Sequence, residues 1–306
     1  MNIHLKLLMG FCVAVLSMQV TFAQQDPQFT QYAYNTLGVN AAYAGSRGHA
    51  TALGLIRTQW VGLDGAPKTQ TFTIDSPLSE RVGLGLAVIN DELGPSRETY
   101  IDLNFSYTIQ TSETRRLSFG IKGGGRFLDI DFTRGNAQNS SDVLFQNNVS
   151  EVLPTIGAGI YWHSDKNYIG ISTPNLLTNQ TYDDIQQTVA AERLHLFIIG
   201  GIVTDLSSDI KFKPAFLVKA VSGAPLIADL SANFMFYEKL RLGVSYRWDD
   251  SVSGLAGFQL TPQLLLGYSY DYTTTELQRF NTGSHEIALR FDLISNGRKL
   301  KSPRFF

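Results

Sequence analysis

Most of this chain repeats one pattern, in which about ten residues alternate between apolar and polar before a break rich in Gly, Asn, Asp, Ser or Pro. In one such segment, the apolar residues occupy every second position from Ile101 to Ile109, and Asp102, Asn104 and Ser106 lie between them. A period of two is the signature of a strand with one apolar and one polar face. The pattern therefore predicts an all-β protein.

Fourteen alternating segments can be counted. The predicted strands are residues 48–60, 67–76, 80–91, 97–110, 115–131, 153–163, 166–173, 192–206, 210–221, 225–237, 239–249, 251–260, 263–273 and 284–294. Each is close to the length of roughly nine to eleven residues that spans a membrane as a tilted strand. The even count suits a single-chain transmembrane antiparallel β-barrel with both termini in the periplasm.

The predicted connections alternate between short and long, which favours a barrel over a sandwich. Short turns are expected at residues 76–79, 110–114, 164–165, 206–209 and 238, and longer connections at 91–96, 131–152, 174–191 and 274–283. Bacterial outer-membrane barrels have this asymmetry between their two ends. We therefore expect residues 48–295 to form the barrel.

The chain begins with the features of a secretory signal peptide. A basic residue, Lys6, precedes a mostly apolar run, and Thr21, Phe22 and Ala23 form a small-x-small cleavage site, which predicts a signal at residues 1–23. The only cysteine, Cys12, lies inside it, so the predicted mature protein has no disulfide and no cysteine metal ligand. These features predict an outer-membrane location.

Two segments flank the predicted barrel. Residues 24–47 alternate little but are rich in aromatic residues, which predicts an N-terminal arm, either periplasmic or folded inward as a plug. Residues 296–306 form a basic tail that carries Arg298, Lys299, Lys301 and Arg304 without an acidic neighbour. The whole chain has a formal net charge of only −2, which gives no reason to expect nucleic acid as a partner.

We find no arrangement of residues that predicts an enzyme, a cofactor or a metal site. The four histidines after the signal, His49, His163, His195 and His285, lie on separate segments without ligand spacing. The glycine run 123–125 lacks the strand–turn–helix setting of a phosphate loop, and we expect it to relieve crowding or to bend a strand.

The polar faces of the strands are expected to line the lumen with charges of both signs. These are Lys122, Arg126, Asp229, Asn233, Arg241, Arg247, Asp249, Asp271, Glu286, Arg290 and Asp292. A pore selective for one ion sign would show rings of one charge, so the mixture favours internal bracing or a plugged lumen. Fourteen strands are too few to pass a folded polypeptide, since sixteen to eighteen leave only an aqueous channel.

Several stretches resemble the PorP/SprF family, in order along the chain from residue 25 to the terminus. They are residues 25–32, 40–45, 169–177, 213–214, 223–225, 242–247, 267–271, 283–287 and 302–306. One departure is Ala41, where the family commonly has proline. The resemblance marks a set of signature residues, as structural or partner contacts: Ser172, Pro174, Asn175, Tyr270, Asp271, Gly283, Ser284, His285, Glu286, Pro303, Arg304 and Phe306.

The resemblance implies an outer-membrane component of the type IX secretion system. That system exports proteins with a C-terminal sorting domain, including adhesins used in gliding motility. Family members of this kind are commonly paired with one adhesin and needed for its secretion or surface retention. Implied partners are the sorting domain, other secretion subunits including the translocon, and outer-membrane lipid.

Our hypothesis is that the barrel is a receptor and anchor and that the export pore is another subunit. The long loops 131–152 and 174–191, or a partly filled lumen, would hold the sorting domain, and the basic tail would contact periplasmic machinery. The alternative is a FadL-like channel for small hydrophobic solutes, whose N-terminal arm plugs the lumen. A solute channel should show a continuous apolar pocket, whereas the inward positions are expected to be mostly polar, small or charged.

Overall fold

The computed structural model describes residues 27–132, 148–177, 180–181, 190–191, 194–222 and 224–293. The predicted signal peptide, most of the predicted loops 131–152 and 174–191, and the predicted basic tail lie outside the described residues. The same is true of three signature residues, Pro303, Arg304 and Phe306.

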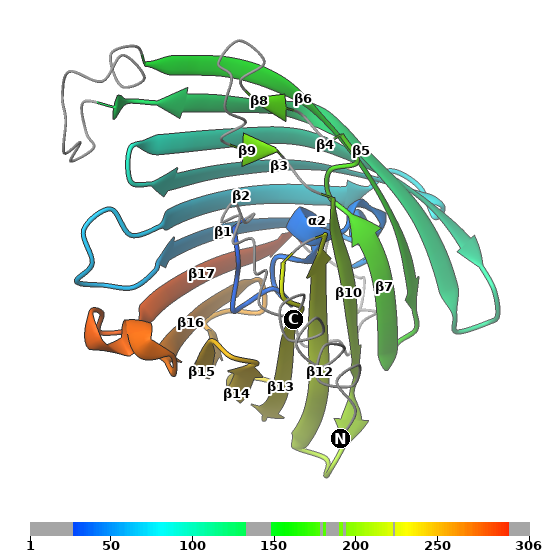
Figure 1. Ribbon diagram of the computed structural model, residues 1–306. Helices are drawn as coiled ribbons and strands as arrows, with labels where there is room; N and C mark the ends of the chain where they lie inside the picture. Colours follow the sequence, from blue (N-terminus) through cyan, green and yellow to red (C-terminus); the bar gives the residue numbers. More distant parts are fainter. Residues whose placement is uncertain are drawn as a thin grey trace, which may run out of the picture.

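The strands form an antiparallel β-barrel (Figure 1). The barrel closes because β10 pairs with β7 on one side and with β12 on the other. In the described part of the chain, the ring consists of β1 (Ala50–Thr58), β2 (Lys68–Pro77), β3 (Val82–Leu93), β4 (Ser96–Gln110), β5 (Arg116–Ile130), β6 (Val149–His163), β7 (Asn167–Thr173), β10 (His195–Ile202), β12 (Ile210–Val221), β13 (Ile227–Phe236), β14 (Leu240–Arg247), β15 (Ser251–Gln259), β16 (Leu264–Thr273) and β17 (Ser284–Leu293).

Three further two-residue strands lie outside this ring. β11 (Thr204–Asp205) continues the pairing with β12, and β8 (Gln180–Thr181) pairs with β9 (Ala190–Ala191) in a separate sheet. Within the described residues, no helix is long and apolar enough to cross a membrane.

The fourteen predicted strands are confirmed, with ends that shift by a few residues. The predicted long connection at 91–96 is wrong, because only Gly94 and Pro95 separate β3 from β4. The ladder continues to the Leu93–Ser96 pair, and Arg97 Nε donates to Glu92 Oε1 at 2.9 Å beside the turn. Gly94 has a φ of +55°, the left-handed conformation that a two-residue hairpin needs.

The two ends of the barrel differ. The tight turns that join β2 to β3, β4 to β5, β6 to β7, β13 to β14 and β15 to β16 meet at one end, which we call the short-turn end. The connections between β1 and β2, β5 and β6, β7 and β10, and β16 and β17 meet at the other, the long-loop end. β1 starts and β17 finishes at the short-turn end.

The outer face of the barrel is apolar and the inner face is largely polar. On β4, Ile101, Leu103 and Phe105 are exposed, whereas Asp102 and Asn104 are each 1% exposed. β2 alternates in the same way from Lys68 to Asp75. An apolar outer band of this kind is what a strand needs to face lipid.

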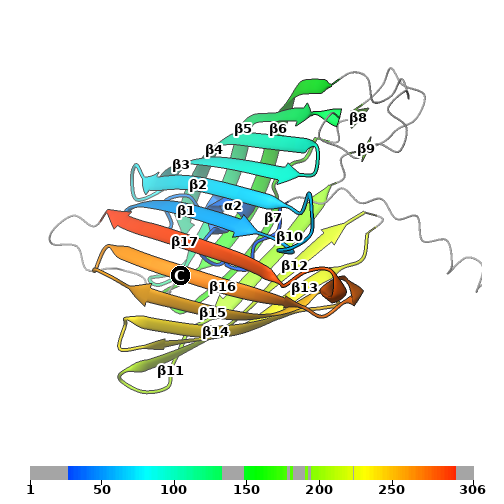
Figure 2. The ribbon, with the colours of Figure 1, turned by 90° about the vertical axis from the view of Figure 1, so that its left-hand side faces the viewer.

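The segment before β1 folds inside the barrel, and we call residues 29–45 the plug. It contains α2 (Thr36–Val39) and η1 (Ala41–Tyr43). α2 contacts β2 and β3, and η1 contacts β4, β5 and β6. Figure 2 shows α2 behind β1 and β2, enclosed by the wall. Of the two predicted positions for the N-terminal arm, the described part takes the inward one.

The plug and one side of the wall share the core of the protein. The wall side chains in this core point inward from β1, β6, β7, β10 and β12, and they are Leu53, Leu55, Tyr161, Tyr168, Phe197, Ile199 and Leu217. Phe29, Tyr32, Leu37 and Val39 of the plug pack against them. The expectation that inward positions are mostly polar, small or charged is therefore wrong for this side, because the apolar face of the plug must be covered.

Glycines on the inner wall let the plug approach the strands closely. A Cβ atom at Gly120 on β5 would lie 2.0 Å from the backbone nitrogen of Ala42. A Cβ atom at Gly83 on β3 would lie 2.1 Å from the carbonyl oxygen of Ala44. The close approach of the plug is thus the reason for small residues at these inward positions.

We expect Gly120→Ala to destabilise the barrel by about 1–3 kcal/mol, because the added methyl group must displace the plug backbone. The measurement is urea unfolding of the protein refolded into lipid vesicles, followed by tryptophan fluorescence. Gly123→Ala on the same strand is the matched control, since its Cβ would meet nothing within 4 Å. Equal stability of the two variants would show that the plug does not rest on β5.

Candidate functional site

A buried ion cluster lies where the start of the plug meets β1, β16 and β17. Arg57 Nη1 is 2.8 Å from Asp271 Oδ2 and 3.2 Å from Glu286 Oε2. All three side chains are at most 3% exposed. One guanidinium thus faces two carboxylates, which leaves a negative charge for another group to offset.

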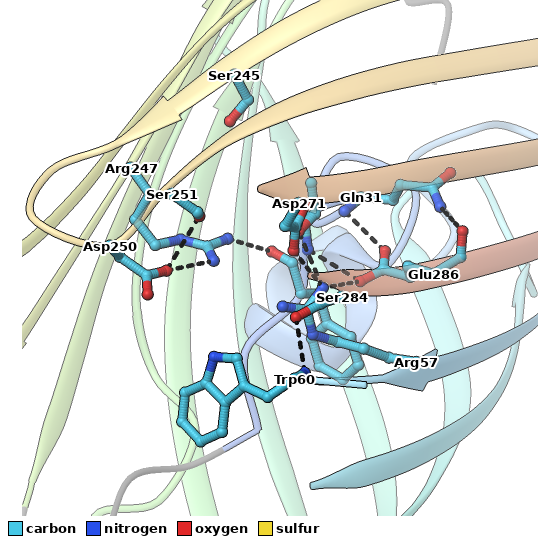
Figure 3. A network of polar contacts seen from close by, with 12 residues as sticks. Gln31, Arg57, Trp60, Ser245, Arg247, Asp250, Ser251, Asp271, Ser284 and Glu286 are labelled. Carbon is cyan, nitrogen blue, oxygen red and sulfur yellow. Dashed lines mark hydrogen bonds and ion pairs between the residues drawn. The ribbon is translucent and has the colours of Figure 1, made fainter. Parts of the chain in front are cut away.

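The plug supplies that group through its backbone (Figure 3). Thr30 N and Gln31 N donate to the two oxygens of the Glu286 carboxylate, at 3.0 and 2.8 Å. The hydroxyl of Thr30 donates to Asp271 Oδ2 at 2.7 Å and accepts from Arg57 Nη1 at 3.0 Å. Hydrogen bonds to a charged group contribute roughly 1.5–3 kcal/mol each, so this cluster is the main anchor of the plug. We call it the anchor cluster.

A second ion pair continues the network toward β13 and β14. Arg247 Nη2 is 3.3 Å from Asp229 Oδ2, and Arg247 Nη1 is 3.0 Å from Asp250 Oδ2. Asp249, predicted to point inward, instead lies exposed in the turn after β14 with a φ of +54°. Burial, with a further contribution from the Asp229 carboxylate, raises the pKa of the Tyr32 phenol above its usual range, so Tyr32 is neutral beside this pair.

The far end of the plug is held by hydrogen bonds to neutral groups and by one from Gly45 N to the Asp75 carboxylate at 2.7 Å. Ser172 Oγ on β7 donates to the carbonyl oxygen of Val39 at 2.9 Å. The Asn40 side chain donates to the carbonyl oxygen of Ile160 at 3.1 Å and accepts from Ala42 N at 3.0 Å, which caps η1. Ser106 Oγ on β4 donates to the carbonyl oxygen of Ala44 at 2.7 Å.

At the long-loop end, two loops meet above the anchor cluster. Trp60 N donates to Ser284 Oγ at 3.1 Å, and Val61 N donates to the carbonyl oxygen of Gly283 at 2.8 Å. Gly283 has a φ of +100°, and a Cβ there would lie 2.6 Å from the carbonyl oxygen of Asp271. Only glycine fits this position, and it brings Ser284 under the β1–β2 loop.

The structure brings most of the described signature residues to the plug or its surroundings. Ser172, Asp271 and Glu286 bond to the plug. Tyr270 donates to the carbonyl oxygen of Thr282 at 2.8 Å in the loop that contains Gly283 and Ser284. His285 is different: as neighbour of the inward Glu286 it points outward, where its Nδ1 is 2.7 Å from the Tyr268 hydroxyl.

Two signature residues, Pro174 and Asn175, line a chamber between the plug and the wall. The empty space in and around the chamber, including solvent at its mouth, is about 820 Å³. Its apolar lining includes Phe29, Tyr32, Val39, Phe197 and Leu217, and its charged lining includes Lys122, Asp102 and Lys219. Because its wall residues lie in the halves of their strands nearest the long loops, the chamber belongs to the long-loop end.

Arg57, which is central to the anchor cluster, was not among the residues predicted from the sequence to line the lumen. The alternation along β1 does contain a signal for it. Arg57 lies two and four residues after Leu55 and Leu53, which puts all three side chains on the same face of the strand, and all three point inward. Nothing in the sequence paired it with Asp271 and Glu286, since both lie more than two hundred residues away, Glu286 by 229.

The chain is similar to one protein family and, at low identity, to solved outer-membrane proteins. A family model described as type IX secretion system membrane protein PorP/SprF matches residues 21–291. A solved FadL homologue from Pseudomonas aeruginosa is similar at 13% identity and a TM-score of 0.48, with 90% of this chain and 96% of that chain covered.

Omp33 of Acinetobacter baumannii is similar at 8% identity and a TM-score of 0.44, with 80% of this chain and 97% of that chain covered. At such low identity these likenesses concern the fold alone. No curated protein sequence is a significant match.

We expect Glu286→Gln to loosen the plug, because it weakens the bonds to Thr30 and Gln31 and leaves the buried Arg57 with one carboxylate. Each hydrogen bond to a charged group that is lost destabilises by about 1.5–3 kcal/mol. The measurement is maleimide labelling of Leu37→Cys, a plug position that is 3% exposed. Labelling should be faster in the Glu286→Gln background.

Glu276→Gln is the control, since Glu276 lies exposed on η4 (Glu276–Arg279). If both backgrounds protect the cysteine as well as the parent barrel does, the anchor cluster is not what holds the plug.

Proposed function

Because the chain belongs to the PorP/SprF family of type IX secretion system membrane proteins, and so to the outer membrane, we propose that its barrel is a receptor and anchor for a secreted substrate. The export pore is then another subunit. The substrate class is a protein with a C-terminal sorting domain, such as a gliding adhesin, and the barrel acts without enzymatic chemistry.

The observation that carries the proposal is the plug. It crosses the lumen and bonds to the wall near its start at Glu286 and near its end at Ser106. A fourteen-strand barrel is too narrow for a folded polypeptide even when empty. With the plug, residues 29–45, inside the lumen, a partner protein has no path through the barrel and would bind at the mouth of the lumen.

The chamber is the proposed contact surface. Its apolar floor, formed by Phe29, Phe197 and Leu217, suits a projecting apolar side chain, and Lys122 and Lys219 stand beside it. Buried aromatic pockets of this kind contribute most of the energy of protein interfaces. The signature residues Pro174 and Asn175 line its rim, next to the predicted loop 174–191.

The orientation follows from the ends of the barrel. Outer-membrane barrels have short periplasmic turns and longer external loops. The short-turn end is then periplasmic, so β1 starts and β17 finishes there and both termini lie in the periplasm. The predicted tail 296–306, with Pro303, Arg304 and Phe306, would contact other secretion subunits, including the translocon.

Ile89 of β3 also lines the chamber. We expect Ile89→Trp to lower the surface level of the substrate at least ten-fold, because the added ring fills the chamber and ~1.4 kcal/mol of lost affinity already corresponds to ten-fold. The measurement is antibody detection of a sorting-domain protein on intact cells, with co-purification of that protein and the barrel from outer membranes.

Leu84→Trp is the matched control, because Leu84 lies on the same strand but on the exposed outer face. A normal substrate level in the Ile89→Trp strain, with the barrel present in normal amount, would contradict the chamber as the contact surface.

The second candidate is a FadL-like channel for small hydrophobic solutes, and the apolar lining of the chamber favours it. The plug, however, fills the lumen below the chamber. We expect deletion of the gene to leave the initial uptake of a radiolabelled fatty acid by whole cells unchanged. A clear fall in uptake that the intact gene restores would make the channel the better reading.

A further inference from the structure

A second cavity lies between plug residues 30–34 and strands β12 to β15. It holds about 470 Å³ of space. Its polar lining is cationic and amide-bearing, with Arg241, Lys213, Asn233 and Gln31, and it includes no carboxylate among the described residues. We call it the cationic cavity.

Arg241 differs from the other inward-facing arginines. In the described part of the chain, Arg47, Arg57, Arg126, Arg247 and Arg290 each lie within ion-pair distance of a carboxylate. Arg241 is only 8% exposed, and its Nη2 donates to Gln259 Oε1 at 3.2 Å. Its Nε and Nη1 have no hydrogen-bond partner in the structure.

A second guanidinium lies nearby and is only partly compensated. The guanidinium carbons of Arg241 and Arg290 are 5.9 and 5.7 Å from the centre of the Tyr34 ring. Arg290 Nη2 is 3.3 Å from Asp292, but that carboxylate also pairs with Arg47 at 3.2 Å. The Nε and Nη1 atoms of Arg290 have no hydrogen-bond partner either.

A buried cation without an anion is unfavourable, because burial removes the water that hydrates it and no counter-charge takes the place of that water. The residues opposite Asn233 and Arg241 in the ladder are Gly243 and Gly257, and the space beside these glycines is taken up by the side chains of Asn233 and Tyr34. Four unbonded guanidinium nitrogens on two side chains are donors of the kind that bind carboxylate and phosphate groups.

We propose that the cationic cavity binds a small oxyanion, a carboxylate or phosphate group, through Arg241, which lines it. Arg241 is the second residue of β14 after the turn at 237–239, so the anion reaches the cavity from the short-turn end. The site is separate from the chamber, and it does not depend on the proposed receptor role.

The test is isothermal titration calorimetry of the full-length barrel in non-ionic detergent and a buffer free of oxyanions. Sodium phosphate and sodium acetate are titrated separately, with sodium chloride as the salt control. We expect one of the two oxyanions to bind with a Kd in the millimolar range or below. The tighter of the two identifies the group as phosphoryl or carboxylate.

Arg241→Gln should weaken binding at least ten-fold, and Arg241→Lys, which keeps the charge but has fewer donors, should weaken it by less. Arg97→Gln is the control, because Arg97 is an exposed arginine at the long-loop end. Retained heat-modifiable migration on gels verifies that each variant is folded. If Arg241→Gln does not fold, the Arg241→Lys titration decides alone.

The proposal is overturned if the parent barrel binds neither anion at ~10 mM, well above a millimolar Kd. It is equally overturned if the folded Arg241 variants bind as tightly as the parent, or if chloride competes as well as the oxyanions do.

Discussion

The constraint on which this structure depends is the volume that fourteen strands enclose. Eight strands make a barrel that side chains can fill, but fourteen leave space, and the polar inner wall needs partners. Here the chain itself fills the space with residues 29–45. The backbone N–H and C=O groups of the plug then need hydrogen-bond partners, and wall residues supply them at both ends of the plug. These residues are Glu286 near the start and Ser172 and Ser106 near the end.

The anchor cluster makes the wall and the plug depend on each other. Without the plug, Arg57 would face two buried carboxylates, Asp271 and Glu286, and their like charges would repel. The N–H groups of Thr30 and Gln31 offset this excess without adding a charge of their own. A carboxylate that receives two backbone donors and a guanidinium is stable in a dry site, whereas without the backbone donors the second carboxylate of this cluster would lack a partner of its own.

Local features of the structure could be predicted from the sequence, because a strand needs only its own alternation and its turn residues. That is why all fourteen strands are confirmed. Features that depend on which residues face one another on different strands could not be predicted. Arg57 has its partners in the last two strands of the barrel, and no local pattern connects them. A shift of one residue along a strand also moves a side chain to the other face. β14 ends at Arg247, two residues earlier than predicted, and the carboxylate that pairs with Arg247 is therefore Asp250 and not the predicted Asp249.

The plug also explains why the inner wall is uneven. Its apolar side packs on Leu53, Leu55 and Leu217, so that part of the wall is hydrophobic, and elsewhere the lumen stays polar and charged. The two cavities inherit this difference: the chamber toward the long loops is largely apolar, and the cavity with Arg241 is cationic. Tyr32 lines both of them. Tyr32 is therefore a wall of both cavities. A shift of the plug backbone at Tyr32 that enlarges one cavity also changes the shape of the other.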